Sequence, residues 1–204
     1  MTREPLSQTV EDGRSMWPIV VGFGGRTKSG KTYLSTKVAL ELGWKRASFG
    51  DRVREVARFR GADPSDVPNL LTIGEELVTT DCEGFCEDVL EAAGWNGRRS
   101  VILDGVRHLI VVNTIKKIIE PLQFRLVFVS ASEETRKNRF RKEFQSTPDL
   151  ISAIDSHSAG RDAEHLKRIA DLVVAMDGQA VPNLIPHTAG VIRDWEKTTA
   201  LDET

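Results

Sequence analysis

A short glycine-rich segment carries the clearest chemical signal in the sequence. Residues 25–32 read GRTKSGKT and match the spacing G-x-x-x-x-G-K-[ST] without a gap. In such a loop the glycines let consecutive backbone N–H groups face phosphate oxygens, and the positive end of a following helix adds to the attraction. Lys31 would reach the β- and γ-phosphates, and the Thr32 hydroxyl would bind Mg²⁺. The alternative is a glycine-rich turn with an exposed lysine. The segment favours a nucleoside triphosphate site formed by Gly25, Arg26, Thr27, Lys28, Ser29, Gly30, Lys31 and Thr32.

A second candidate residue is an aspartate at the end of an apolar segment. Residues 100–105 read SVILDG, a β-branched run typical of a strand that is buried on both faces. A carboxylate at the end of such a strand can hold the metal ion of a bound nucleotide, directly or through water. We therefore expect Asp104 on the metal side of the site, together with Thr32. The alternative is a solvated aspartate that caps the next helix.

Arginines close to these residues could bind further phosphate groups. Arg107 follows the acidic strand end directly, near the place where the phosphate of an acceptor would lie. Arg136 and Arg139 are three residues apart in a charged segment, so on a helix both can point at one target. With Arg141 and Lys142 they form a cationic cluster that repulsion disfavours unless an anion compensates it. A surface network is the alternative, with partners Glu133, Glu134 and Glu143.

The elements that must position these residues alternate between strand and helix. Short apolar runs predict buried strands at residues 18–23, 46–49, 100–105, 124–130 and 170–176. Helical spacing and capping signals predict helices from the glycine loop to Gly43 and at residues 51–60, 69–93 with a break near 79–84, 108–120, 132–144, around 147–149, and 163–169. This order predicts an α/β fold with a parallel five-stranded sheet between two helical layers. A ligand would lie at the carboxyl ends of the strands.

Composition and charge restrict the kinds of partner. The chain has 204 residues, of which 28 are basic and 30 acidic, so its formal charge is -2. This balance gives no bulk attraction to nucleic acid or to a membrane surface, and we expect a small-molecule partner and neither of those. Two cysteines, Cys82 and Cys86, cannot form a disulfide framework. The four histidines show no metal-ligand spacing: His108, His157, His165 and His187.

The two ends of the chain lack the patterns of buried elements. Residues 1–17 are polar without an apolar run, which predicts an N-terminal extension that is neither a signal peptide nor a membrane anchor. Residues 18–187 are expected to form the domain, and residues 188–204 a weakly packed C-terminal tail. We accordingly expect a cytoplasmic protein that is a monomer or a homodimer.

Several segments resemble one family of phosphotransferases. DGVR at residues 104–107 looks like the DGxPR and DGxR segments of nucleoside monophosphate kinases. GFGGRTKSGKT and ASFGDRVREVA resemble the phosphate loop and the acceptor-side helix of deoxynucleoside monophosphate kinases from phages and bacteria. ADLVVAMDG resembles a late strand of these enzymes and of dephospho-coenzyme A kinases. Over residues 19–178 the chain is similar to the P-loop nucleoside monophosphate kinase superfamily, most of all to the deoxynucleoside monophosphate kinases.

The resemblance implies a function and roles for particular residues. It implies the three-layer P-loop NTPase fold, with a helical acceptor-binding region at about residues 50–95 and a lid at about 132–160. ATP and Mg²⁺ would be the cofactors, and a nucleoside or deoxynucleoside monophosphate the acceptor. Arg107 would hold the acceptor phosphate, while Lys31, Asp104, Arg136 and Arg139 would act in transfer. The acceptor pocket would be lined by Asp51, Arg52 and Arg54, for which a solvated helix face is the alternative.

Two further functions stay open at this stage. Dephospho-coenzyme A is the alternative acceptor. A nucleotide-binding switch or scaffold without efficient transfer is the other alternative, because Val78 and Thr79 stand where the resembled kinases usually have an arginine. The intact Lys31, Thr32 and Asp104 favour an enzyme.

Overall fold

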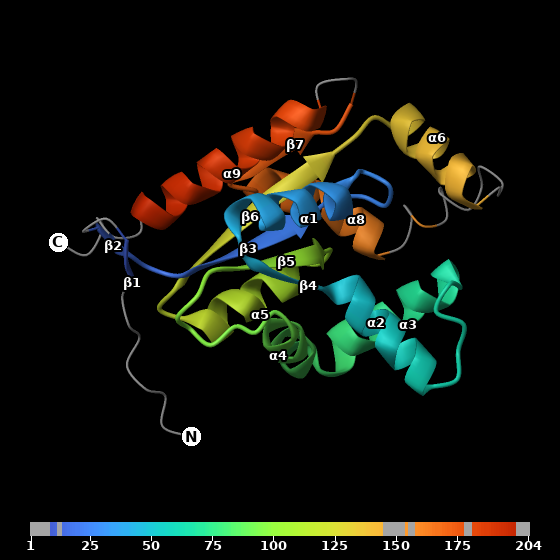
Figure 1. Cartoon of the computed structure of the whole chain (residues 1–204). Coiled ribbons are helices and arrows are strands. Elements are labelled where there is room, and N and C mark those ends of the chain that lie inside the picture. The colour runs from blue at the N-terminus through green and yellow to red at the C-terminus, as the bar shows by residue number, and fades with distance from the viewer. Residues whose placement is uncertain (1–8, 12–13, 145–153, 155–157, 178–180, 199–204) are drawn as a thin grey trace.

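A parallel sheet forms the centre of the molecule (Figure 1). The computed structural model describes residues 9–11, 14–144, 154, 158–177 and 181–198. Its five-stranded sheet has the order β4-β5-β3-β6-β7, and every neighbouring pair is parallel. The strands are β3 (Ile19–Gly24), β4 (Lys45–Ser48), β5 (Val101–Val106), β6 (Gln123–Ser130) and β7 (Leu172–Ala175). The predicted α/β fold with a five-stranded parallel sheet is confirmed.

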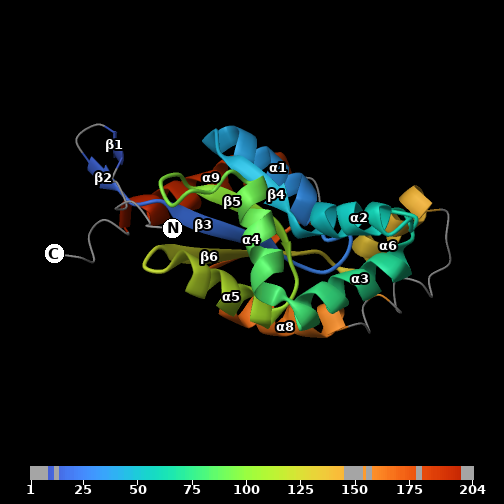
Figure 2. The same cartoon turned by 90° about the horizontal axis from the view of Figure 1, so that it is seen from below.

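Helices cover both faces of this sheet. α1 (Lys31–Leu42) and α9 (Val181–Thr198) lie on one face, and α5 (Leu109–Ile119) and α8 (Ser158–Ile169) on the other (Figure 2). Strand residues alternate between the two layers, since Ile19, Val21 and Phe23 join the core beneath α1, whereas Val20 joins the opposite core. The order of strands and helices along the chain therefore produces the three layers that the sequence predicts.

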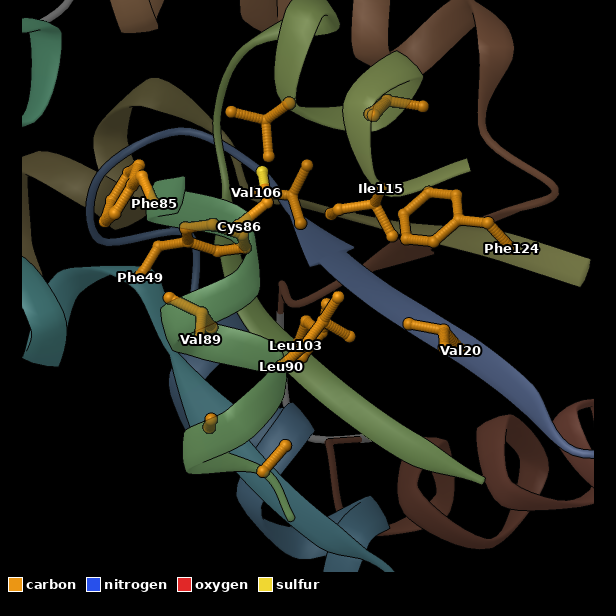
Figure 3. Close-up of a cluster of buried hydrophobic side chains, with 14 of the residues drawn as sticks. Val20, Phe49, Phe85, Cys86, Val89, Leu90, Leu103, Val106, Ile115 and Phe124 are labelled. Atoms are coloured by element: carbon orange, nitrogen blue, oxygen red, sulfur yellow. The ribbon is translucent and has the colours of Figure 1, made fainter. Parts of the chain in front are cut away.

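A helical region extends beyond the carboxyl ends of the strands (Figure 1). It contains α2 (Phe49–Phe59) and α3 (Val67–Thr80), followed by α4 (Cys82–Ala92) against the sheet. The expected break in the long helical segment is confirmed at Asp81, which ends α3 and accepts a hydrogen bond from the Gly84 N–H at 2.9 Å as the N-cap of α4. Figure 3 shows the Phe49 and Phe85 rings together, with centroids 5.2 Å apart in an edge-on arrangement. This contact fixes the start of α2 against α4.

The C-terminal segment differs from its expectation. The sequence predicts a weakly packed tail over residues 188–204, but α9 continues through Thr198 and packs against α1 and the sheet. Ala189 and Ile192 are fully buried. The apolar residues of this segment recur at helical spacing, so the expectation missed an amphipathic helix.

The structure also describes parts of the N-terminal extension and of the segment at about 132–160 that is predicted as a lid. The N-terminal extension contains a small antiparallel pair, β1 (Thr9–Glu11) with β2 (Arg14–Met16). α6 (Glu133–Phe144) follows its predicted cap, because the Ser132 hydroxyl accepts from the Thr135 N–H at 3.2 Å. The helix predicted around residues 147–149 lies outside the described residues. Within the described part of the chain, no helix is long and apolar enough to span a bilayer.

Candidate functional site

The glycine loop turns sharply between β3 and α1. Gly25 has a φ of 144°, and a Cβ at this position would lie 2.2 Å from the carbonyl oxygen of Val129. Gly30, the residue before α1, has a φ of 97°, and Lys28 also has a positive φ of 62°. These backbone conformations bring residues 25–30 back over the start of α1, as the sequence motif requires.

Lys31 is buried at the first turn of α1. Its side chain is 7% exposed, and no carboxylate forms an ion pair with it among the described residues. The pKa of the Lys31 ammonium is lowered to about 7, mainly by burial and to a smaller extent by the charge of Arg107, whereas Asp104 opposes the shift. A buried cation without a paired anion is expected to attract a phosphate group strongly.

Thr32 and Asp104 meet, as the sequence predicts. The Thr32 hydroxyl donates to Oδ2 of Asp104 at 2.9 Å, and Asp104 is only 2% exposed. The same Oδ2 accepts from Nη2 of Arg46 at 2.6 Å. Oδ1 of Asp104 is buried and has no hydrogen-bond partner in the described structure. Among the described residues, Oδ2 therefore accepts two hydrogen bonds and Oδ1 accepts none.

These oxygens suit a magnesium ion. A hydroxyl and a carboxylate are hard oxygen ligands, which Mg²⁺ prefers, and the unused Oδ1 is a buried acceptor that lacks a proton donor. No group of three or more His, Cys, Asp or Glu residues that could hold a metal ion exists among the described residues. Thr32 and Asp104 could hold Mg²⁺ only together with oxygens of a ligand or of water, since they supply two side chains.

A cavity of about 340 Å³ opens directly beside this loop. It lies between the loop, the end of β5 and helices α2, α3, α5 and α6. Its charged and polar side chains are those of Thr27, Lys28, Lys31, Thr32, Tyr33, Arg54, Glu75, Arg107 and His108. Its apolar side chains are those of Phe49, Val53, Val67, Leu70, Leu71, Val78, Phe85, Val111 and Phe140. The cavity is thus lined by four basic side chains, those of Lys28, Lys31, Arg54 and Arg107, and the larger part of its wall is apolar.

Arg107 and Arg54 both line the cavity. Nη1 of Arg107 donates to the Thr27 hydroxyl at 3.3 Å, and no carboxylate forms an ion pair with Arg107 in the described structure. Burial lowers the pKa of the Arg107 guanidinium, which Arg54 lowers further and Asp104 raises. Arg54 is held at 2.9 Å by Oδ1 of Asp51. The structure thus brings together Lys31, Arg107 and Arg54, which came from three separate segments of the sequence.

Two of the three predicted acceptor-side residues do not line this cavity. Nη2 of Arg52 instead donates to Oδ2 of Asp88 on α4 at 2.6 Å, and Arg52 also contacts Glu55. Asp51 and Arg52 line a separate groove between α2, α4 and β4. For Arg52 the reason is helical geometry, because residues two apart, such as Arg52 and Arg54, point about 200° apart around the axis. Asp51 is three residues from Arg54 and pairs with its guanidinium instead. Residues 51, 52 and 54 therefore cannot all face one pocket.

The two arginines of α6, Arg136 and Arg139, contact the loop backbone. Nη1 of Arg136 donates to the Thr27 carbonyl at 3.3 Å. Nη1 of Arg139 donates to the carbonyls of Lys28 and Ser29 at 3.1 and 2.9 Å. Arg136 is only 4% exposed, which does not fit a solvated surface network. Both side chains share one target, as their spacing predicts, but neither lines the cavity itself.

Other predicted cations lie outside the cavity. Nη2 of Arg26 donates to Oε1 of Glu164 on α8 at 3.3 Å, and this pair is exposed. Arg141 donates to the amide oxygen of Asn138 within α6 at 3.2 Å. Arg26 therefore links the loop to α8, whereas Arg141 contacts its own helix.

Two residues of the site, Arg46 and His108, have no local sequence signal that predicts their role. Arg46 pairs with Asp104 from β4, and a lone arginine within a short predicted strand was the signal that could have drawn attention to it. His108 lines the cavity beside Arg107, and its Nδ1 lies 3.5 Å from Oδ2 of Asp162. Burial lowers the pKa of the His108 imidazole, and Arg107 lowers it further, although Asp162 opposes the shift. Metal-ligand spacing could not reveal this histidine, because its partner lies on α8.

Sequence comparison finds two proteins related to this chain. No family model matches the chain. It is 27% identical over 165 residues to a UPF0200 protein of Methanothrix thermoacetophila, covering 80% of this chain and 87% of the relative. It is 26% identical over 145 residues to a UPF0200 protein of Methanoculleus marisnigri, covering 69% and 78% of the two chains.

Solved structures with a similar fold include several kinases. Shikimate kinase from Acinetobacter baumannii in complex with shikimate matches with a TM-score of 0.58 at 13% identity, over 87% of this chain and 94% of that one. A gluconokinase from Sinorhizobium meliloti matches with a TM-score of 0.56 at 14% identity, over 93% and 99%. The fold is that of the P-loop kinases. Identities of this size show a shared fold, so the acceptor must be inferred from the cavity itself.

Proposed function

We propose that this chain transfers the γ-phosphoryl group of ATP to a nucleoside or deoxynucleoside monophosphate, giving the diphosphate and ADP. The observation that carries the proposal is a single cavity that contains both Lys31 and Thr32 of the phosphate loop and Arg107 beyond β5. A donor phosphate on the loop and an acceptor phosphate on Arg107 would then lie in the same cavity. Phosphoryl transfer depends mainly on such positioning and on neutralisation of charge.

The donor side would use the loop and the two oxygen ligands. Backbone N–H groups of the loop and the Lys31 ammonium would bind the β- and γ-phosphates. Thr32 and Asp104 would hold Mg²⁺, which when bound neutralises charge on the transferring phosphoryl group. ATP and Mg²⁺ are accordingly the proposed cofactors.

The acceptor side fits a molecule with an anionic end and a flat apolar body. Arg107 lacks a carboxylate partner among the described residues and presents the planar fork that suits phosphate oxygens. Arg54 adds a second cation to the same cavity. The apolar wall formed by Phe49, Val53 and other side chains would suit a nucleobase. A sugar-like acceptor is less favoured, because its many hydroxyls would lose hydrogen bonds against this wall.

The lid would act through Arg136 and Arg139. Both arginines donate hydrogen bonds to carbonyls of the loop whose backbone N–H groups would hold the donor. In this proposal they keep the loop in shape and supply positive charge near the γ-phosphoryl group.

A hydroxyl acceptor of the dephospho-coenzyme A kind is the second candidate, and His108 is the observation that favours it. Transfer to a hydroxyl releases a proton, whereas transfer to a phosphate oxygen needs no base. Burial lowers the pKa of His108 and so favours the neutral imidazole, and the carboxylate of Asp162 lies beside Nδ1. Nε2 of this histidine could then accept the proton of a hydroxyl.

A panel of acceptors tests the proposal. The purified chain is incubated with Mg²⁺ and ATP labelled at the γ-phosphate, together with each nucleoside and deoxynucleoside monophosphate, dephospho-coenzyme A, shikimate or gluconate. We expect labelled diphosphate with at least one monophosphate, at a rate about a hundredfold or more above ATP hydrolysis alone. Label on dephospho-coenzyme A alone would establish the second candidate. ATP binding without transfer to any acceptor would instead support the nucleotide-binding switch.

The variant His108→Gln separates the two acceptor chemistries. It should leave transfer to a monophosphate within a few-fold of the unmodified chain. If the acceptor is a hydroxyl, it should reduce kcat about a hundredfold or more, because the general base is lost.

A further inference from the structure

Arg46 lies between the proposed metal carboxylate and α1. Its Nη2 donates to Oδ2 of Asp104 at 2.6 Å, and its Nε donates to the Ser35 hydroxyl at 3.1 Å. The Ser35 hydroxyl donates in turn to the Thr32 carbonyl at 3.1 Å. With the bond from the Thr32 hydroxyl to Asp104, these contacts form a closed ring of four residues, which passes through both the side chain and the backbone carbonyl of Thr32. The ring joins β4, β5 and the first turn of α1.

The ring determines which oxygens stay available. Oδ2 of Asp104 accepts from both Arg46 and Thr32, so its lone pairs are used. Oδ1 is buried and has no donor in the described structure. The Thr32 hydroxyl gives its only proton to Asp104, which leaves the lone pairs of Oγ1 free to face a cation. Hydrogen bonds within the protein therefore determine that Oδ1 of Asp104 and the lone pairs of Thr32 Oγ1 remain available to a cation.

The geometry points to Arg46 as a positioning residue for magnesium. We infer that Arg46 fixes the rotation of the Asp104 carboxylate, keeps Oδ2 turned away from the cation, and reserves Oδ1 for the cation or for one of its waters. Such partners of metal ligands commonly contribute about 10- to 100-fold to metal affinity. This inference rests on the proposed use of Mg²⁺ and ATP, but it does not depend on which acceptor is used.

An opposing effect of Arg46 can be separated by experiment. A guanidinium is a positive charge close to the cation, and by charge alone its removal should strengthen Mg²⁺ binding. Positioning predicts the reverse, because a carboxylate without Arg46 can rotate and lose the alignment of Oδ1. The sign of the change in Mg²⁺ affinity therefore distinguishes the two effects.

The test measures binding and needs no turnover. The affinity for a fluorescent ATP analogue is determined without divalent ions, and Mg²⁺ is then titrated against the analogue complex, for the unmodified chain, Arg46→Ala and Arg46→Lys. Arg46→Ala should weaken Mg²⁺ binding about 10-fold or more and leave the Mg²⁺-free affinity within about twofold. Arg46→Lys should recover part of the loss, because a lysine can donate to Asp104 but cannot form the two-sided contact of a guanidinium.

Arg125→Ala is the matched control. Arg125 also lies on a strand and pairs with an aspartate, with Nη1 3.0 Å from Oδ1 of Asp171. This pair belongs to β6 and the residue just before β7, whereas Arg46 is on β4, across the central strand β3. Its loss should leave Mg²⁺ binding unchanged, while thermal melting of each variant reports any general loss of stability.

Each outcome has a definite meaning. Unchanged or tighter Mg²⁺ binding in Arg46→Ala overturns the inference and leaves the proposed function intact. Equal losses of Mg²⁺-free and Mg²⁺-dependent affinity would show that Arg46 only maintains the fold of the loop, which also overturns it. If the unmodified chain binds no ATP analogue at all, the proposed function fails, and this inference fails with it.

Discussion

Lys31 connects proton binding to nucleotide binding. In the free chain, burial lowers the pKa of its ammonium to about 7, so above this pH most molecules have a neutral Lys31. A triphosphate bound beside it favours the charged form and raises the pKa. Binding above pH 7 must then take up a proton, and the affinity for ATP should fall by up to about tenfold per pH unit.

Calorimetry can measure this uptake directly. ATP is titrated at pH 8 in two buffers that differ in ionisation enthalpy, and the difference gives the number of protons taken up. We expect a value approaching one for the unmodified chain and close to zero for Lys31→Met. Equal heats in the two buffers for the unmodified chain would show that the Lys31 pKa is not lowered.

Arg107 should act on the acceptor rather than on ATP. Its guanidinium lines the cavity next to Thr27 and has no carboxylate partner among the described residues. The phosphate of a bound acceptor would therefore be the first anionic group to pair with it. Arg107→Ala should raise the KM of the acceptor about 10- to 100-fold, because a charge-assisted contact is lost. Arg107→Lys should recover only part of this affinity.

Initial rates at varied acceptor concentration and saturating ATP give the acceptor KM of each variant. Arg193→Ala, on the exposed side of α9, is the control and should leave the acceptor KM unchanged. An increase in the KM of ATP with an unchanged acceptor KM would place Arg107 on the donor side instead.

At the scale of elements, α9 forms part of the core. Ile192 is fully buried between α9, α1 and the sheet, and Oε1 of Glu196 accepts from the buried Ser100 hydroxyl at the start of β5. Ile192→Ala should lower the free energy of unfolding by about 2 to 5 kcal/mol, through lost burial and the cavity that remains. The affinity for ATP should stay within about twofold, because α9 does not line the cavity.

Urea denaturation measures this loss. Asp194→Ala is the control on the same helix, since Asp194 is exposed and its carboxylate pairs with the exposed Lys197. It should change stability by less than about 0.5 kcal/mol. A similarly small loss in Ile192→Ala would mean that the segment is a weakly packed tail, as its sequence position first suggested.

Local patterns predicted most of the elements, and contacts between distant segments were not predictable. The glycine loop and the apolar strands have signals within a few residues, so their positions and the sheet could be inferred. The pairing of Arg46 with Asp104 crosses 58 residues, and no local pattern encodes it. The same holds for His108 with Asp162, which are 54 positions apart in the sequence. Arg52 was misplaced for a different reason, since helical geometry alone would have separated it from Arg54.

For the whole molecule, the main consequence of one shared cavity is that a single ligand could occupy both sides. An analogue in which five phosphates join an adenosine to a second nucleoside would reach from the loop to Arg107, if the cavity holds donor and acceptor together. Linking two ligands makes the second contact intramolecular, so such an analogue should bind about a hundredfold or more tighter than ATP. At equal concentration it should also raise the melting temperature further than ATP does.

Thermal melting with ATP, with the linked analogue and with each nucleoside monophosphate tests this consequence. In Arg107→Ala the analogue should lose its advantage and stabilise the chain no more than ATP, because its acceptor half has lost the cation that holds it. The ATP response itself should persist in this variant, since Lys31 and the loop are unchanged. An analogue that stabilises the unmodified chain no more than ATP would exclude a nucleotide from the apolar part of the cavity. Transfer to a hydroxyl acceptor, with His108 as base, would then become the function to test.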